Sequence, residues 1–204
     1  MKSRKHYRMG LLLVVFIALA TVFVIGQHPQ VAPEAQKEEA LKIYQSKNPA
    51  LNFNFEYPAI GWTPKESQGT SQAYDAVQLL GPADAEKEYS AYFSVGVRTL
   101  KPEQLNEDFL SALVKESERF KGFRVLEEKK IRIEGRDHPS VTFEYMLRLP
   151  LWKKSAKDVL VKKTVVFITR GNRSYRISCG GTADQFKRYS PVFEKARETF
   201  RILL

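Results

Sequence analysis

Alternating hydrophobic and polar residues predict most of the strands in this chain of 204 residues. From Leu51 to Tyr57 every second residue is leucine or aromatic, which is typical of a strand with one buried face. Pro58 ends this strand, and Gly61 and Trp62 follow in a turn. The same kind of pattern predicts further strands at residues 73–80, 89–100, 125–134, 139–149, 158–170 and 174–179.

Apolar residues at helical spacing predict three helices. The segment 33–46 is rich in helix-forming residues, so we expect a short helix there. A longer helix is expected from Lys101 to Phe120, with an apolar stripe along one side. The last is expected at residues 183–200, with Thr182 as its N-terminal cap.

The order of these elements predicts the fold class. Runs of strands separated by single helices are typical of an α+β fold with a mainly antiparallel sheet. The strands at 89–100 and 158–170 carry apolar residues on both faces. We therefore expect helices to cover both faces of the sheet.

The first 26 residues combine a basic flank with an apolar run. Four lysines and arginines in residues 1–8 precede an uncharged stretch at residues 10–26. About 17 apolar residues can span a bilayer, and basic residues stay on its cytoplasmic side. We predict a transmembrane helix at residues 10–26 that tethers the rest of the chain outside the cytoplasm, in the periplasm or at the outer face. Cleavage after Gly26 is the alternative, and it would release a secreted protein.

The remaining chain is long enough for one domain. Residues 27–49 are predicted to be a linker with the short helix, and residues 50–204 to be a domain with its own core. Cys179 is the single cysteine, which excludes an intrachain disulfide. We expect its side chain to be a small buried hydrophobe rather than a reactive thiol.

The net charge of +10 is concentrated in the second half of the chain. Residues 121–204 hold 20 basic and 9 acidic side chains, whereas residues 50–120 hold 6 basic and 11 acidic ones. A basic surface of this kind favours anionic partners or anionic lipid headgroups. Nucleic acid is not expected as a partner, because the domain is predicted to lie outside the cytoplasm.

The sequence predicts no enzyme. No nucleophile motif or phosphate-binding loop is present, and His138 is the single histidine of the domain. One histidine beside Asp137 is weak evidence for a metal site, so this pair is interpreted as part of a turn before Pro139. We therefore expect no catalytic residues, no metal and no cofactor.

The best candidate binding surface is the hairpin tip from Pro150 to Lys157. A tryptophan beside lysines suits a membrane interface, and it equally suits a protein partner. The alternative is that the apolar residues fold back onto the domain while the lysines are solvated. The candidate partner-binding or lipid-binding residues are Leu151, Trp152, Lys153, Lys154, Lys157, Lys162 and Lys163.

The strand that ends at Pro58 and is followed by Gly61 and Trp62 resembles the opening of PsbP-like domains. Gly135 before a strand, and the aromatic strand Ser174–Ile177 before a terminal helix, are similar to later parts of that family. The resemblance covers about residues 50–204. It implies an α/β/α sandwich shared by photosystem II extrinsic proteins, bacterial DcrB-like envelope proteins and a nuclear transport factor that binds a small GTPase.

The resemblance implies a binding and assembly module rather than an enzyme. With the predicted anchor, it leads us to expect a tethered domain that supports the assembly or stability of a membrane or envelope protein complex. The alternative is recognition of anionic lipid headgroups, or of a small anionic ligand, through the basic half of the chain and the Trp152 loop.

Overall fold

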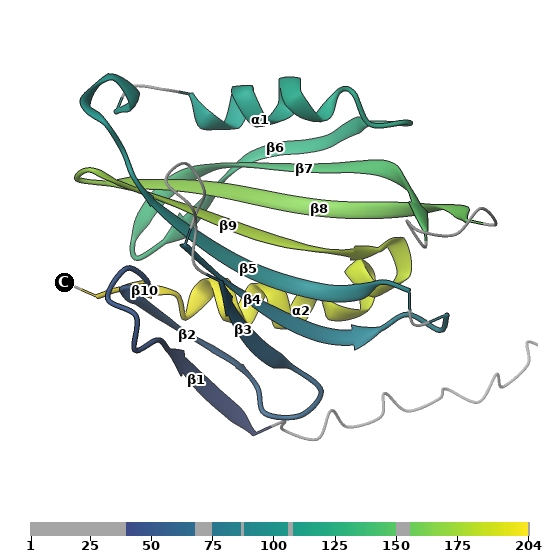
Figure 1. Cartoon of the computed structure of the whole chain (residues 1–204), viewed down its shortest axis with the longest axis horizontal. Coiled ribbons are helices and arrows are strands. Elements are labelled where there is room, and N and C mark those ends of the chain that lie inside the picture. The colour runs from purple at the N-terminus through teal and green to yellow at the C-terminus, as the bar shows by residue number, and fades with distance from the viewer. Residues whose placement is uncertain (1–39, 68–74, 87, 106–107, 150–155, 204) are drawn as a thin grey trace, which may run out of the picture. The chain divides into compact units, whose positions relative to one another are not determined.

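The structure, a computed structural model, describes residues 40–67, 75–86, 88–105, 108–149 and 156–203. Figure 1 shows its elements, which are antiparallel strands and two α-helices. Their bounds are β1 (Leu41–Gln45), β2 (Phe53–Pro58), β3 (Thr63–Ser67), β4 (Asp75–Ala83), β5 (Ser90–Thr99), a 3-10 turn η1 (Pro102–Gln104), α1 (Phe109–Ser117), β6 (Arg124–Ile133), β7 (Arg136–Leu149), β8 (Lys157–Arg170), β9 (Arg173–Thr182), α2 (Ala183–Glu198) and β10 (Arg201–Ile202).

The described strands form a large sheet and a small one. The large sheet has seven strands in the order β3-β4-β5-β9-β8-β7-β6, and the small sheet has three in the order β1-β2-β10. Every pair of neighbouring strands is antiparallel. The α+β prediction with mainly antiparallel sheets is therefore confirmed.

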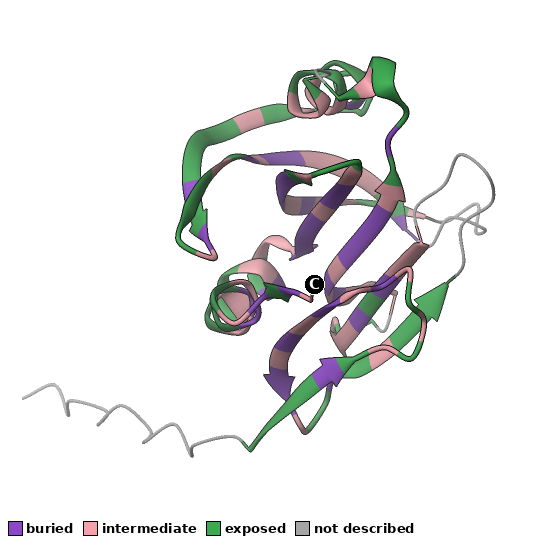
Figure 2. Cartoon of the chain, turned by 90° about the vertical axis from the view of Figure 1, so that its left-hand side faces the viewer, coloured by how far each residue is buried: buried purple, intermediate pink, exposed green. Residues whose placement is uncertain are grey.

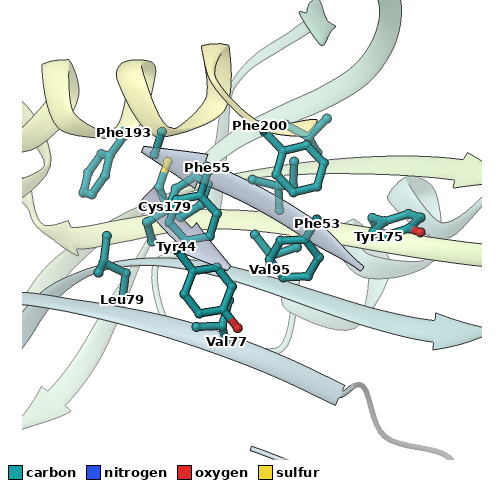
Figure 3. Close-up of a cluster of buried hydrophobic side chains, with 14 of the residues drawn as sticks. Tyr44, Phe53, Phe55, Val77, Leu79, Val95, Tyr175, Cys179, Phe193 and Phe200 are labelled. Carbon is teal, nitrogen blue, oxygen red and sulfur yellow. The ribbon is translucent and has the colours of Figure 1, made fainter. Parts of the chain in front are cut away.

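The main core lies between one face of the large sheet and a layer formed by α2 and the small sheet. Phe53 and Phe55 of β2 are fully buried there, with Phe93 of β5 and Phe200 after α2. Their rings are in contact: the centroids of Phe55 and Phe93 are 5.0 Å apart, and those of Phe53 and Phe200 are 5.4 Å apart. Figure 3 shows Phe53 and Phe55 of β2 with Phe200, and Val95 of β5 beside them.

A second, smaller core lies on the other face of the large sheet, under α1. Phe109 and Leu113 of α1 pack on Phe143 of β7 and on Val165 and Phe167 of β8. Alternate residues of β8 thus belong to different cores, since Val166 and Ile168 face the main core. Figure 2 shows the resulting alternation of buried and exposed positions along the strands. Helices lie on both faces of the sheet, as the two-sided apolar pattern predicted.

Two short elements differ from the sequence prediction. The short helix predicted at 33–46 is wrong over the described residues, because Leu41–Gln45 is strand β1. Pairing with β2 stacks Tyr44 on Phe55 at 5.0 Å, and the Tyr44 hydroxyl donates to Glu66 at 2.8 Å. This tertiary contact outweighs a weak helical preference. Strand β3 was not predicted, since its sequence has no apolar alternation and it lies at a sheet edge.

The helix predicted at 101–120 is shorter in the structure. Asp108 begins α1 by accepting hydrogen bonds from the N–H groups of Leu110 and Ser111, at 3.1 and 3.0 Å. A side chain that caps these orphan donors fixes the start of a helix. The cap predicted at Thr182 is confirmed, because Thr182 and Gln185 form a reciprocal capping box at the start of α2.

The predicted transmembrane helix at residues 10–26 lies outside the described residues. Among the described helices, none is long and apolar enough to cross a membrane.

Replacing Gly81 with alanine is predicted to destabilise the domain by about 2 kcal/mol, through overpacking. A Cβ atom at Gly81 would lie 2.6 Å from the Trp62 ring, which is held edge-on by Tyr189 and Phe193. Urea unfolding of Gly81→Ala, Trp62→Leu and the double variant measures this. We expect the double variant to lose less stability than the two single changes added together. Additive losses would contradict the contact.

Candidate functional site

The structure separates the lysines that the sequence grouped together. Leu151, Trp152, Lys153 and Lys154 lie outside the described residues. Lys157 is exposed at the start of β8, where its ammonium lies 3.4 Å from the carboxylate of Glu86. Lys162 and Lys163 are adjacent on β8, and successive residues of a strand point to opposite faces. These two lysines therefore belong to different surfaces.

Lys162 is part of a surface ion-pair network. Its ammonium lies 3.8 Å from the carboxylate of Glu144, its register partner on β7. Arg124 of β6 binds the same carboxylate at 2.5 Å. Glu144 is itself buried and binds two cations. The role of Lys162 is therefore explained by an ion pair that joins neighbouring strands.

Lys163 lies on the α1 side of the sheet, among tyrosines. Its register partners are Phe143 on β7 and Gly180 on β9. Gly180 in turn pairs with Tyr92 on β5, whose ring lies across the glycine: a Cβ atom at Gly180 would be 2.8 Å from the Tyr92 hydroxyl. The absence of a side chain at Gly180 thus lets Tyr92 extend across β9 in the direction of Lys163.

Two further phenols complete this group. Tyr89 shares side-chain hydrogen bonds with Tyr92 and with Tyr145 of β7. Burial raises the pKa of all three tyrosines above the ordinary value. Their hydroxyls therefore stay protonated at neutral pH and remain hydrogen-bond donors. We call Tyr89, Tyr92, Tyr145 and Lys163 the Lys163 cluster.

The ammonium of Lys163 is the charged group of the cluster. Burial, with a smaller contribution from the guanidinium of Arg176, lowers the pKa of Lys163 to about 8. Lys163 is thus still mainly protonated at pH 7, although the folded state disfavours its charge. Among the described residues, no carboxylate lies within ion-pair distance of this ammonium. A half-buried ammonium without a carboxylate partner can bind the carboxylate or phosphate group of a ligand.

The sequence indicated only one member of this cluster. Lys163 was singled out for its charge, whereas Tyr89, Tyr92 and Tyr145 were missed. Tyr92 alternates with the buried Ala91 and Phe93, so its place on the opposite face was readable from the strand pattern. Its approach to β7 and β8 was not, because that depends on the strand order β5-β9-β8-β7.

The structure also places the histidine and the cysteine that the sequence analysis considered. His138 lies in strand β7 and pairs with Ile131, so the prediction of a turn at this residue is wrong. Burial lowers its pKa, as does the nearby Arg170. Cys179 is buried as predicted, and burial raises the pKa of its thiol to about 11. Within the described part of the chain, no cluster of three histidine, cysteine or acidic side chains is placed to hold a metal ion.

A shallow groove of about 150 Å³ lies between α2 and the large sheet, with Cys179 among its lining residues. Three charged side chains of its wall have a partner within the wall: Lys129 lies 2.8 Å from Glu127, and Glu194 accepts a hydrogen bond from Ser190 at 3.4 Å. The thiol of Cys179 stays protonated at neutral pH, because burial raises its pKa. The Lys163 cluster is therefore the better candidate site.

Replacing Lys163 with methionine is predicted to stabilise the folded domain by on the order of 1 kcal/mol at pH 7. The folded state lowers the pKa of this lysine from 10.5 to about 8, so the wild-type chain becomes more stable as the pH rises from 8 towards 10.5. The gain in the variant should be largest below pH 8 and should shrink above it. Urea midpoints of both proteins between pH 6 and 9 test this, and an unchanged or lower stability of Lys163→Met at pH 7 would contradict it.

Comparison with protein-family models and with curated protein sequences finds no match. Comparison with solved structures recovers the PsbP-like resemblance that the sequence indicated. Cyanobacterial PsbP (CyanoP) from Synechocystis is 15% identical with a TM-score of 0.46, over 80% of this chain and 93% of that one. LpqN, involved in cell envelope biogenesis of Mycobacterium tuberculosis, is 12% identical with a TM-score of 0.47, over 82% and 92% of the two chains. The yeast Ran-binding protein Mog1p is 12% identical with a TM-score of 0.44, over 81% and 96%. Similarity at this level concerns the overall architecture alone.

Proposed function

We propose that the chain is a membrane-tethered binding module whose domain lies outside the cytoplasm and supports the assembly or stability of a membrane protein complex, without catalysis. The uncharged residues 10–26 behind a basic flank support the tether and its orientation. The basic second half of the chain supports an acidic partner.

The observation that carries this proposal is the half-buried ammonium of Lys163, which forms no ion pair with the described residues. A cation that the fold disfavours and leaves without a carboxylate among the described residues costs stability, and such a cost is typical of residues kept for binding. The three phenols on the same face hydrogen-bond each other, which leaves one phenolic proton that can be donated to a ligand. The cluster thus suits a single carboxylate or phosphate group, presented by an acidic side chain of the partner.

A second candidate function uses the same chemistry. A phosphate group of an anionic lipid, or a small free anion, would meet the same ammonium and the same hydroxyls. This alternative is favoured by the small size of the cluster, which matches one anionic group rather than an extended protein surface. In either case Lys163, and not Lys162, is the lysine that contacts the anion.

The two adjacent lysines provide the test. The tagged full chain is crosslinked in native membranes and purified as wild type, Lys163→Met and Lys162→Met. Loss of one charged hydrogen bond weakens binding about tenfold or more, so we expect Lys163→Met to lose most of the crosslinked partner. Lys162→Met, on the opposite face, should keep it. Equal losses would indicate a diffuse basic surface, and equal retention would exclude the cluster as the binding site.

Vesicles and free anions distinguish the second candidate. Acylation of Lys163 in the purified full chain is followed by mass spectrometry, with Lys157 as the internal reference. If the anion is a lipid headgroup, phosphatidylglycerol vesicles should slow the acylation of Lys163 and phosphatidylcholine vesicles should not. If it is a free anion, inorganic phosphate alone should give the protection. If only the crosslinked protein partner protects Lys163, the assembly function is supported.

A further inference from the structure

Large apolar side chains are exposed at one end of the small sheet. Ile60 is 74% exposed, Ile43 67% and Leu41 46%, which are the three highest values among the exposed large hydrophobic side chains of the described residues. Leu41 and Ile43 lie on the same side of β1, opposite to Tyr44, which enters the main core. These two side chains therefore point away from the domain.

Ile60 lies in the turn after β2, at the same end of the small sheet as Leu41. Leu41 pairs with Pro58 of β2, and the N–H of Ala59 donates to the carbonyl of Ala40 at 2.8 Å. The turn that contains Ile60 comes directly after these two residues, which are bonded to the start of β1. Figures 1 and 2 both show this turn and the start of β1 side by side. We call Leu41, Ile43 and Ile60 the β1 patch. β1 is the edge strand of the small sheet, so no described strand covers its outer side.

The length of chain before β1 indicates what lies against the patch. Only 14 residues, 27–40, connect the apolar segment 10–26 to the start of β1. Even fully extended, they reach about 50 Å, and a flexible chain holds its ends much closer. With residues 10–26 in a bilayer, this end of the domain is therefore kept within about 50 Å of the membrane surface.

We propose that the β1 patch inserts into the interfacial layer of the membrane that holds the tether. This inference rests on the tether of the proposed function and adds an orientation to it. The small sheet covers the main-core face of the large sheet, whereas the Lys163 cluster lies on the α1 side. With β1 against the bilayer, the large sheet separates the cluster from that membrane. The cluster then faces a partner or a free anion rather than the lipids beneath the domain.

Labels at single cysteines test this orientation in the full chain, reconstituted in phosphatidylethanolamine–phosphatidylglycerol vesicles. The buried Cys179 is replaced by alanine, and an environment-sensitive fluorophore is attached at Ile43→Cys or Ile60→Cys. Leu126→Cys, at a position 39% exposed on β6, is the matched control. An inserted side chain rests near the boundary of headgroups and acyl chains. Lipids brominated near the headgroup should therefore quench the labels at positions 43 and 60 at least about twofold more than the label at 126.

The outcomes separate the inference from the proposed function. Equal, weak quenching at all three positions, with the chain still resistant to carbonate extraction, would overturn the interfacial patch and leave the tether intact. A chain that carbonate releases would overturn both. A blue shift at positions 43 and 60 without bromolipid quenching, together with energy transfer between labelled copies, would assign the patch to contact with a second copy instead.

Discussion

The structure depends on the burial of β2, whose aromatic side chains join two sheets that share no strand. Phe53 and Phe55 are fully buried, and they contact Phe93 of the large sheet on one side and Phe200 on the other. Each such ring removes a large apolar area from water and adds a favourable ring contact. β2 also pairs with β1 and β10, so the two ends of the described chain are fixed by the same strand.

This arrangement leaves the two faces of the large sheet with different chemistry. On the main-core face, β5 and β9 contribute Phe93, Val95 and Ile177. On the other face the same strands carry Tyr92, Ser94 and Arg176, and α1 packs mainly on β7 and β8. Since the main core supplies most of the apolar burial, this second face tolerates polar groups. Lys163, whose pKa is lowered, lies on this second face.

Long, regular elements were predictable from the sequence, whereas contacts between distant strands were not. The alternation before Pro58 identified β2, and Thr182 identified the start of α2, since each signal is local. β1 was predicted as a helix because Tyr44 gains its stabilisation from Phe55 and Glu66, which a local pattern does not contain. β3 was missed because an edge strand needs no apolar alternation.

In the candidate site, too, the local features could be predicted from the sequence and the contacts between distant strands could not. Its charge was visible, since Lys163 stands in a basic stretch, and Lys162 beside it was grouped with it. Strand geometry alone places adjacent residues on opposite faces, so their separation could be predicted once the strand was. The tyrosines were not accessible in the same way. Tyr89, Tyr92 and Tyr145 come from segments that become neighbours only through the strand order of the sheet.

The position of β10 has a consequence for the time at which the domain can fold. Arg201 and Ile202 pair with β2, and the N–H of Leu203 donates to the carbonyl of Asn52 at 2.8 Å. A chain whose synthesis has not reached residues 200–203 lacks these contacts, so the side of β2 that faces Phe200 stays uncovered until they are added. Contacts of such wide sequence separation form slowly and late. The closing of the main core around β2 therefore has to wait until residues 200–203 have been synthesised.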